Sequence, residues 1–547
     1  MSQSEQTQTT QPAIFVREST GLVKNVSFFD SIAMNLSNMS VGALLGVIGI
    51  AGLAPMLFSG QDMSGVNLVL LSVISFILSF PQIVVYTIMS RRYPRSGGDY
   101  VYVSRVFGGP FGSIISFMGY TLETTAYLAL IVLSTVFAIG SVGLFFTFDP
   151  TLLGLAVPSG LGPANSTNQF LLGSILFSIL IAINILKPKA GYRLVSALTI
   201  LGFFAILLAM GVLLSAGPTG VQSYINSANG AFSINGSQTY SIVSSSCGFA
   251  HTACSSSFSW GPTIFLLPLM AAFVYPWLNA SPAVAAEIKG KSALKWNVPI
   301  SAFLVFAFLT SSVGVMYLTA GQAFTNQAYT NPTLVFGLPP AATTFNFFTL
   351  AMGVSGNAVV AAMIGLGWIL IDLSVLAYGV IVISRYLLAQ SFDRFLPARI
   401  SNVSSRFGSP ITAHLVDLVI TLALVGFAAF AYSSGGIGGA DALFGAILAS
   451  MVYFIFVGLS AAVHGMRKEQ GTTKWILVLA GILNVFIFGF LSYQFLAYPN
   501  VWALHPLTYY FIGGSVIAGA LIYYGSRRYN KKRGIDISLA YKELPPG

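Results

Sequence analysis

Charge is scarce in this sequence: Asp, Glu, Lys and Arg make up 7% of its 547 residues, and it has only four histidines and two cysteines. Neither His-Glu-x-x-His nor Gly-x-Ser-x-Gly occurs, so the common zinc and serine hydrolase motifs are missing. The string GKS at residues 290–292 has Ala285 where a phosphate-binding loop needs glycine. We therefore predict that the protein is not an enzyme and carries no metal and no resident cofactor.

Apolar residues, by contrast, are abundant. They make up 55% of the chain, and the mean hydropathy is +0.80, which indicates that lipid surrounds most of the molecule. Runs of 18 or more mostly apolar residues can each cross ~30 Å of hydrocarbon as a helix. We predict an all-α polytopic membrane protein with about twelve transmembrane helices. The expected spans are 28–58, 66–90, 100–142, 168–186, 191–216, 262–287, 297–321, 357–388, 410–432, 440–465, 474–496 and 503–525.

The basic residues support this topology. All 25 Lys and Arg residues fall in the N-terminal tail (1–27), in the C-terminal tail (526–547), or in the loops after the even-numbered spans and the span ends that adjoin these loops. Because Lys and Arg resist translocation, we expect both termini in the cytoplasm and the protein in the plasma membrane. The polar start shows no cleavable signal, so the first span is expected to act as the anchor. The formal charge of +10 sits in short loops, which argues against nucleic-acid binding.

The longest polar segment, an expected extracellular loop at 217–261, holds both cysteines. Cys247 and Cys254 would face an oxidising compartment, which favours a local disulfide over two free thiols. A metal site using Cys247, His251 and Cys254 would lack a fourth ligand.

Two carboxylates, Glu123 and Asp372, lie deep in apolar spans, near the expected middle of the bilayer. An ionised group there is costly, so each must face the protein interior, bind a cation or stay protonated. A protonated side chain that hydrogen-bonds between helices is the simplest alternative to a role in ion coupling or substrate binding. Asp30, Glu287 and Asp417 lie nearer the inner ends and suit orienting or gating roles.

Two spans are unsuited to a continuous helix. The first reads AMNLSNMSVGALLG (33–46), where Asn and Ser side chains compete for backbone hydrogen bonds. The sixth reads AAFVYPWLNASPAVAAE (271–287), where Pro276 and Pro282 each remove a backbone donor. A simple proline kink is the alternative for the sixth span. Spans 1 and 6 are equivalent in a 5+5 inverted repeat of 28–216 and 262–465, with two peripheral helices in 466–525, and so are spans 3 and 8, which hold the buried carboxylates.

Four segments together resemble the amino acid-polyamine-organocation (APC) superfamily of transporters. They are YPRSGGDYVYVSRVFG (93–108), AAEIKG (285–290), SRYLLAQSFDRFLP (384–397) and FGSPITA (407–413). The resemblance implies a LeuT-like fold with discontinuous helices 1 and 6, and a secondary active permease that moves amino acids by alternating access. A proton or sodium gradient, or exchange, would drive it. The alternatives are a carrier of polyamines or another organic ion, or a transport-inactive nutrient sensor.

The resemblance also implies roles for individual residues. Substrate binding maps to two segments, with Phe273 or Tyr275 as a lid over the substrate; the residues are Ser37, Asn38, Met39, Ser40, Val41, Gly42, Phe273, Val274, Tyr275, Pro276, Trp277 and Asn279. Coupling to H+ or Na+ would use Glu123, Asp372 and Ser374. An inner gate would contain Arg91, Asp99 and Glu287, with Asp99 paired to a nearby arginine; a plain cytoplasmic loop is the alternative. Ser40-Val41 and Pro276-Trp277 depart from the family pattern, which leaves room for a non-standard substrate.

Overall fold

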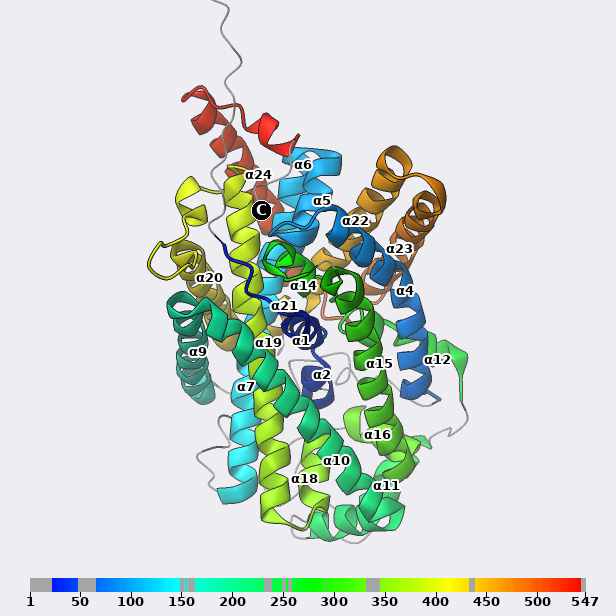
Figure 1. Cartoon of the computed structure of the whole chain (residues 1–547). Coiled ribbons are helices and arrows are strands. Elements are labelled where there is room, and N and C mark those ends of the chain that lie inside the picture. Colours follow the sequence, from blue (N-terminus) through cyan, green and yellow to red (C-terminus); the bar gives the residue numbers. More distant parts are fainter. Residues whose placement is uncertain are drawn as a thin grey trace, which may run out of the picture.

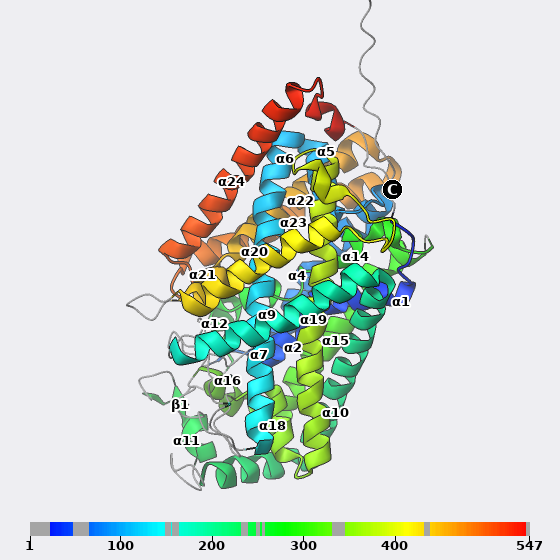
Figure 2. The ribbon, with the colours of Figure 1, turned by 90° about the vertical axis from the view of Figure 1, so that its left-hand side faces the viewer.

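The structure is a computed structural model, and it describes residues 22–47, 65–147, 152, 155, 163–230, 239–247, 252–253, 258–290, 292–330, 345–431 and 438–542. Its architecture is helical, as Figure 1 shows, with long helices packed around the short helices α1, α2 and α14 in the middle of the molecule. A quarter turn shows an elongated bundle with α24 running along one side (Figure 2).

Ten helices, or unbroken runs of helix, are long and apolar enough to cross a membrane among the described residues. They are α4 (Leu68–Arg92), α6 to α7 (Gly109–Thr147), α9 (Pro163–Leu186), α10 (Pro188–Gly230), α15 (Ala293–Thr319), α19 (Ala358–Phe392), α20 (Ile411–Phe430), α21 to α22 (Gly439–Lys468), α23 (Gly471–Ala497) and α24 (Pro506–Lys531). Each matches one of the expected spans. The prediction of a polytopic helical membrane protein is therefore confirmed.

One predicted boundary is wrong. The third span does not start at residue 100, because α5 (Gly98–Phe107) is a separate helix that ends at Gly108, where φ is +83°. The span itself consists of α6 (Gly109–Ser116), the π-helix η1 (Phe117–Leu122) and α7 (Glu123–Thr147). The predicted end of the fifth span at 216 coincides with a kink in α10, where the backbone of Gly217 is not helical and a second helical stretch follows to Gly230.

The first and sixth expected spans are broken, as predicted. α1 (Phe28–Asn38) and α2 (Val41–Val47) are separated at Met39 and Ser40. The sixth segment is divided into α12 (Trp260–Phe265), α13 (Pro268–Ala271), α14 (Ala280–Ala283) and the 3₁₀ turn η5 (Ala285–Glu287). Neither segment forms a helix of 18 residues within its described part.

Short elements connect the long helices. They are α11 (Thr239–Ser245), the antiparallel pair β1 (Ser246–Cys247) and β2 (Thr252–Ala253), α16 (Gln322–Thr330), α18 (Phe347–Val354), η6 (Ala398–Ser401) and η7 (Ile537–Tyr541).

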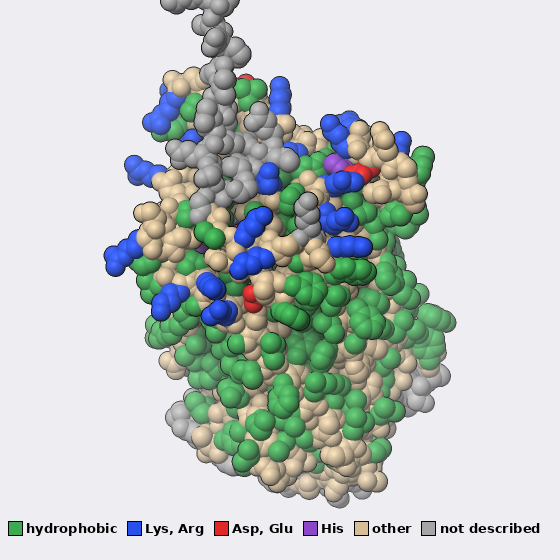
Figure 3. All heavy atoms as spheres, in the orientation of Figure 1, with side chains coloured by type: hydrophobic (Ala, Val, Ile, Leu, Met, Phe, Trp, Pro, Cys, Tyr) green, Lys and Arg blue, Asp and Glu red, His purple; other side chains and the backbone are tan. Residues whose placement is uncertain are grey.

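The Lys and Arg side chains gather at one end of the molecule, the upper end in Figure 3. We call this the basic end; it carries the residues around 91–95, 187–193, 394–406, 467–474 and 527–533. On the face drawn in Figure 3 the other end shows no Lys or Arg. This asymmetry is the one expected from the sequence.

Candidate functional site

The break in the first span is fixed by the backbone at Ser40. Its φ of +52° is a left-handed conformation that costs energy for any residue with a Cβ. The Ser40 hydroxyl lies within hydrogen-bond distance of two carbonyl oxygens, those of Ser37 (3.2 Å) and Asn38 (3.0 Å), which stabilises the turn. Beyond the break, Gly42 lets α2 approach α19 closely, because a Cβ there would come within 2.2 Å of Ile371.

The break in the sixth segment spans Ala272 to Asn279. Here the regular ladder of hydrogen bonds is lost: the amides of Val274 and Tyr275 both donate to the carbonyl of Met270. The Trp277 indole N–H donates to the carbonyl of Ala272 at 3.1 Å and so replaces a missing backbone donor. Inside a membrane protein, an unwound segment is possible only where protein, water or ligand satisfies its backbone polar groups.

The two breaks are joined directly. Asn38 Nδ2 donates to Asn279 Oδ1 at 3.0 Å, and Asn35 exchanges two hydrogen bonds with Ser281, one through its amide nitrogen at 2.8 Å and one through its oxygen at 2.9 Å. The Tyr378 hydroxyl of α19 donates to Asn38 Oδ1. All of these side chains are buried. The predicted binding segments 37–42 and 273–279 are therefore brought together.

Trp277 occupies the space beside the breaks. Its ring is stacked on Tyr127 of α7, with centroids 5.9 Å apart and planes 9° apart, and it meets Phe454 of α22 edge-on at 5.6 Å. The side chain is 1% exposed. Any molecule bound between α7, α22 and the breaks must share this space with the indole or displace it.

The two residues proposed as lids point in different directions. Phe273 stacks on Phe444 of α21 with centroids 4.5 Å apart and lies near Trp502 of the loop before α24. The Tyr275 hydroxyl instead lies 2.6 Å from the Ser72 hydroxyl of α4, so its ring is turned into the helix packing. Tyr275 is a packing residue in this structure, and the lid role of Phe273 stays a prediction.

The buried carboxylates Glu123 and Asp372 each accept a hydrogen bond from a serine hydroxyl. Ser450 Oγ donates to Glu123 Oε2 at 2.5 Å, and Ser134 Oγ donates to Asp372 Oδ2 at 2.9 Å. The other oxygen of Asp372 is buried and has no hydrogen-bond partner among the described residues. The Ser374 hydroxyl donates to the carbonyl of Ile371, which leaves its lone pairs unused. No arginine or lysine offsets either carboxylate in the described part of the chain.

Asp99 does not form the predicted pair with an arginine. The nearby Arg105 binds Asp393 instead, with Nη2 2.8 Å from Oδ1. Asp99 is fully buried and accepts four hydrogen bonds. The donors are Tyr86 (2.6 Å), Asn279 (3.0 Å), Tyr453 (2.8 Å) and Tyr386. Because Asn279 also binds Asn38, a continuous chain of hydrogen bonds links Asp99 to the first break.

Burial raises the pKa of Asp99, and the four hydrogen bonds oppose this shift. The glycines before it make the close packing possible. Gly97 and Gly98 both have positive φ, and a Cβ on Gly98 would come within 3.0 Å of the Ala283 backbone nitrogen.

Glu287 is held in a buried ion pair with Arg385 of α19, at 2.7 Å and 3.0 Å, and Tyr192 of α10 donates to the same carboxylate at 2.7 Å. Two backbone segments flank it. Val26 forms a parallel bridge to Ile288, and the amide of Gly97 donates to the carbonyl of Ala283 at 2.9 Å. The segment 283–289 is thus bonded on both sides at the basic end. Arg91, the third predicted gate residue, is exposed there and lines a cavity.

Asp30 has a local role, because it completes a capping box with Ser27 at the start of α1 and accepts a hydrogen bond from Ser196 of α10 at 2.6 Å. Asp417 is fully buried and accepts a hydrogen bond from Thr421, one turn along α20, at 3.0 Å. Its other oxygen has no partner among the described residues, as in Asp372. The proposed disulfide falls outside the described residues, since Cys254 is not among them; the backbone of Cys247 pairs with Thr252.

Comparison with known proteins decides the class. The family model for "Amino acid permease" matches residues 26–521. The chain belongs to the amino acid permease family. Members of this family are transporters and not enzymes. The permease is also similar to "Uncharacterized protein 399" of Sulfolobus islandicus rod-shaped virus 1, at 25% identity over 194 residues. That match covers 36% of this chain and 40% of the viral protein.

Sequence reasoning missed several residues of this site. It did not single out Tyr86, Tyr386 and Tyr453, which come from α4, α19 and α22 and meet only at Asp99. No local pattern marks them, because each lies in an ordinary apolar helix. Arg385 and Asp393 carried a weak signal: both are charges in the segment SRYLLAQSFDRFLP.

Proposed function

We propose that this permease carries amino acids across the plasma membrane by alternating access, with both termini in the cytoplasm and the basic end facing inward. The observation that carries the proposal is the direct link between the two broken segments through Asn38 and Asn279. Broken helices that meet in the middle of a membrane protein supply backbone groups for a polar ligand. The arrangement supports a LeuT-like 5+5 inverted repeat with two peripheral helices.

The substrate would bind beside the breaks. The first amides of α2, at Val41 and Gly42, are the natural partners of a carboxylate, because a helix start presents unsatisfied N–H groups. The unwound carbonyls of 273–279 suit an ammonium group. Trp277 would limit the size of the substrate side chain, and Phe273, in its aromatic cluster, would close the outer side.

The bonded segment 283–289 would form the inner gate with Arg91, Asp99 and Glu287. Inward opening requires this segment to part from Val26 on one side and Gly97 on the other. The chain of hydrogen bonds from Asn38 through Asn279 to Asp99 offers a route by which substrate at the break would loosen the gate.

Asp372, with Ser374 beside it, would bind the coupling cation or carry the proton, and Glu123 is the second such group. Asp372 is the better supported of the two, since one of its oxygens has no partner among the described residues. A buried carboxylate without a cation must take up a proton or an ion, and either event changes the local charge.

The test is ligand binding followed by uptake. Purified protein is heated with amino acids, polyamines or other organic ions, with and without sodium, at two pH values. A ligand at 100 times its dissociation constant adds ~2.7 kcal/mol of stability. Hits are then tested for uptake into vesicles that contain the protein. Stabilisation and uptake of an amino acid are the expected result.

Asn38→Ala and Asn484→Ala form a matched pair for this test. Both asparagines are 1% exposed and hydrogen-bond another segment, but Asn484 binds the Phe454 carbonyl from the peripheral helix α23. We expect Asn38→Ala to abolish binding and Asn484→Ala to preserve it. Binding of polyamines alone would favour the carrier of other organic ions, and binding without uptake would favour the sensor.

A further inference from the structure

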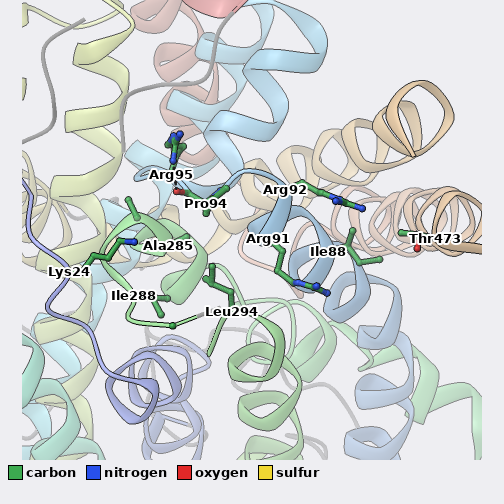
Figure 4. Close-up of a pocket in the computed structure, with 12 residues that line it drawn as sticks. Lys24, Ile88, Arg91, Arg92, Pro94, Arg95, Ala285, Ile288, Leu294 and Thr473 are labelled. Carbon is green, nitrogen blue, oxygen red and sulfur yellow. Dashed lines mark hydrogen bonds between the residues drawn. The ribbon is translucent and has the colours of Figure 1, made fainter. Parts of the chain in front are cut away.

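A cavity of about 910 Å³ lies at the basic end, beside the segment 283–289. Figure 4 shows Lys24 reaching toward Ala285 from the N-terminal segment, and Arg91 beside Ile88 at the end of α4. The lining residues are Lys24, Ile88, Arg91, Arg92, Pro94, Arg95, Ala285, Ala286, Ile288, Gly290, Leu294 and Thr473. Four of them are basic, and none of these described lining residues is acidic.

Three of the four cations have no ion-pair partner among the residues that the structure describes. Arg92 pairs with Glu469, its Nε 2.6 Å from Oε1. Lys24, Arg91 and Arg95 form no ion pair with any residue that the structure describes. The Nε of Arg95 is moreover buried and has no hydrogen-bond acceptor in the described part of the chain. Several cations around one cavity, one with an unused donor, favour an anionic ligand.

The cavity lies at the depth of lipid headgroups. Two exposed tryptophans, Trp296 of α15 and Trp475 of α23, follow closely after the lining residues Leu294 and Thr473. The amino groups of Lys295 and Lys474 lie over these rings, 5.0 Å and 5.3 Å from their centroids. Exposed Trp beside Lys is typical of the membrane–water interface.

The cationic residues come from both sides of the bonded segment. Lys24 lies two residues before Val26, which forms the bridge to Ile288. Arg95 directly precedes Ser96, which forms the bridge to Val284. Lys24 and Arg95 thus each lie next to a residue that is bonded to the segment 283–289, so anionic headgroups held by them would sit beside the two bridges.

We infer that this cavity binds the phosphate headgroup of an anionic phospholipid, and that the bound lipid holds the segment 283–289 closed at the basic end. The regulatory half of this inference rests on the proposed function, because it takes that closed segment as the inner gate. The lipid site itself does not. A headgroup phosphate that reaches any of Lys24, Arg91 or Arg95 would partner a cation that has no ion pair among the described residues.

Binding is measured first. The protein is titrated with phosphatidylglycerol in mixed micelles or nanodiscs, and thermal stability and lipid retention in native mass spectrometry are recorded. We expect stabilisation by phosphatidylglycerol but not by phosphatidylcholine, and about fivefold weaker binding for each of Lys24→Gln, Arg91→Gln and Arg95→Gln. Arg406→Gln, an exposed cation of the same end outside the cavity, is the control and should bind as the wild type does.

Arg91→Lys keeps the charge and should retain most of the affinity, which separates lost binding from damaged folding. Equal stabilisation by both lipids, or unchanged binding in all three Gln variants, would overturn the site. Inorganic phosphate or glycerol phosphate that stabilises the protein as well as phosphatidylglycerol does would overturn the assignment to a lipid.

Closure is measured by thiol labelling. Ser96→Cys is placed in a background with Cys247→Ser and Cys254→Ser, because Ser96 is 4% exposed and becomes accessible only if the bonded segment parts. Phosphatidylglycerol should slow labelling at least threefold, and Arg95→Gln should remove this effect. Labelling that ignores the lipid would reject the regulatory role. Neither measurement needs a transported substrate, so a failure to transport amino acids would reject the proposed function and leave the lipid site intact.

Discussion

The carboxylates of the basic end and those between the long helices lie in contrasting environments. Glu287 is bound by Arg385 through two hydrogen bonds and by Tyr192 through a third. Asp372, also fully buried, accepts a hydrogen bond from Ser134, and its second oxygen has no partner among the described residues. A buried ion pair with all its hydrogen bonds made stabilises one structure, whereas a buried carboxylate with few donors can gain or lose a proton or a cation. The contrast separates Glu287, a proposed gate residue, from Asp372, a proposed coupling residue.

The largest expected effect comes from breaking the buried ion pair between Glu287 and Arg385. Glu287→Gln leaves the Arg385 charge buried without a counterion, and we expect a loss of ~3–5 kcal/mol in the free energy of unfolding. Denaturant unfolding in detergent measures it. The double variant Glu287→Gln/Arg385→Gln should recover part of the loss. Arg92→Gln is the control, since Arg92 has a side chain 52% exposed and its pair with Glu469 should contribute only about 0–1 kcal/mol. Equal losses in both would show that burial does not distinguish these pairs.

Asp99 lies between the two extremes, because it has four donors but no cation. Asp99→Asn removes an acceptor that satisfies three tyrosine hydroxyls, and we expect a loss of ~1–3 kcal/mol. Labelling of Ser96→Cys should also become faster as the segment 283–289 loosens. Asp536→Asn, which changes an exposed carboxylate that caps η7, is the control. Unchanged labelling in Asp99→Asn would remove Asp99 from the gate.

The raised pKa of Asp99 predicts that the free energy of unfolding depends on pH. Burial raises the pKa of Asp99 in the folded protein, so the folded state binds this proton more tightly than the unfolded state. The contribution of Asp99 to stability is then complete at low pH and declines as pH rises through the raised pKa. The free energy of unfolding of the wild type, relative to Asp99→Asn, should decrease as pH increases across the acid range. A constant difference would show that Asp99 does not titrate there.

Substitutions of Asp372 and Glu123 should change the ion dependence of uptake more than they change stability. Asp372→Asn keeps the shape of the group, so we expect a change below about 1 kcal/mol in stability but loss of the dependence of uptake on proton or sodium. Glu123→Gln tests the second candidate in the same assay. Uptake that keeps its full ion dependence in Asp372→Asn would exclude Asp372 from coupling.

The smallest expected effect is at Ser374. Its hydroxyl already donates to the Ile371 carbonyl, so only its neutral lone pairs remain for a cation. Ser374→Ala should therefore weaken sodium dependence less than Asp372→Asn does, with a change in stability below ~0.5 kcal/mol. Sodium titration of uptake compares the two. A larger effect at Ser374 would mean that the ion depends on the hydroxyl more than on the charge.

Much of the fold could be predicted because membrane helices obey simple rules. Length and hydropathy located the long spans, and Asn, Ser and Pro located the two breaks, since these residues disturb the backbone ladder wherever they occur. The beginning of the third span was missed. The helix α5 is less apolar than α4 and α6, and the Gly-Gly-Pro sequence at 108–110, with a φ of +83° at Gly108, separates it from α6.

The hydrogen-bond partners of the site residues could not be predicted from the sequence. The sequence identified Asp99 and Glu287 as unusual charges, but several donors were available to each of them. Arg105 lies six residues from Asp99 and nevertheless binds Asp393, 288 residues away. Tyr275 was expected over the substrate and instead faces Ser72. The partner of each side chain depends on which faces of the helices pack against one another.

The sequence by itself determined the class of protein, the positions of the ten long apolar helices found among the described residues, the gathering of basic residues at one end and the sites of the two breaks. These properties follow from composition and from local backbone chemistry, which every residue carries with it. The tertiary structure decided which polar groups satisfy which: the Asn38–Asn279 link, the tyrosine donors around Asp99 and the Glu287–Arg385 pair. A buried polar group must find a partner, but which one it finds is fixed only when distant helices pack together.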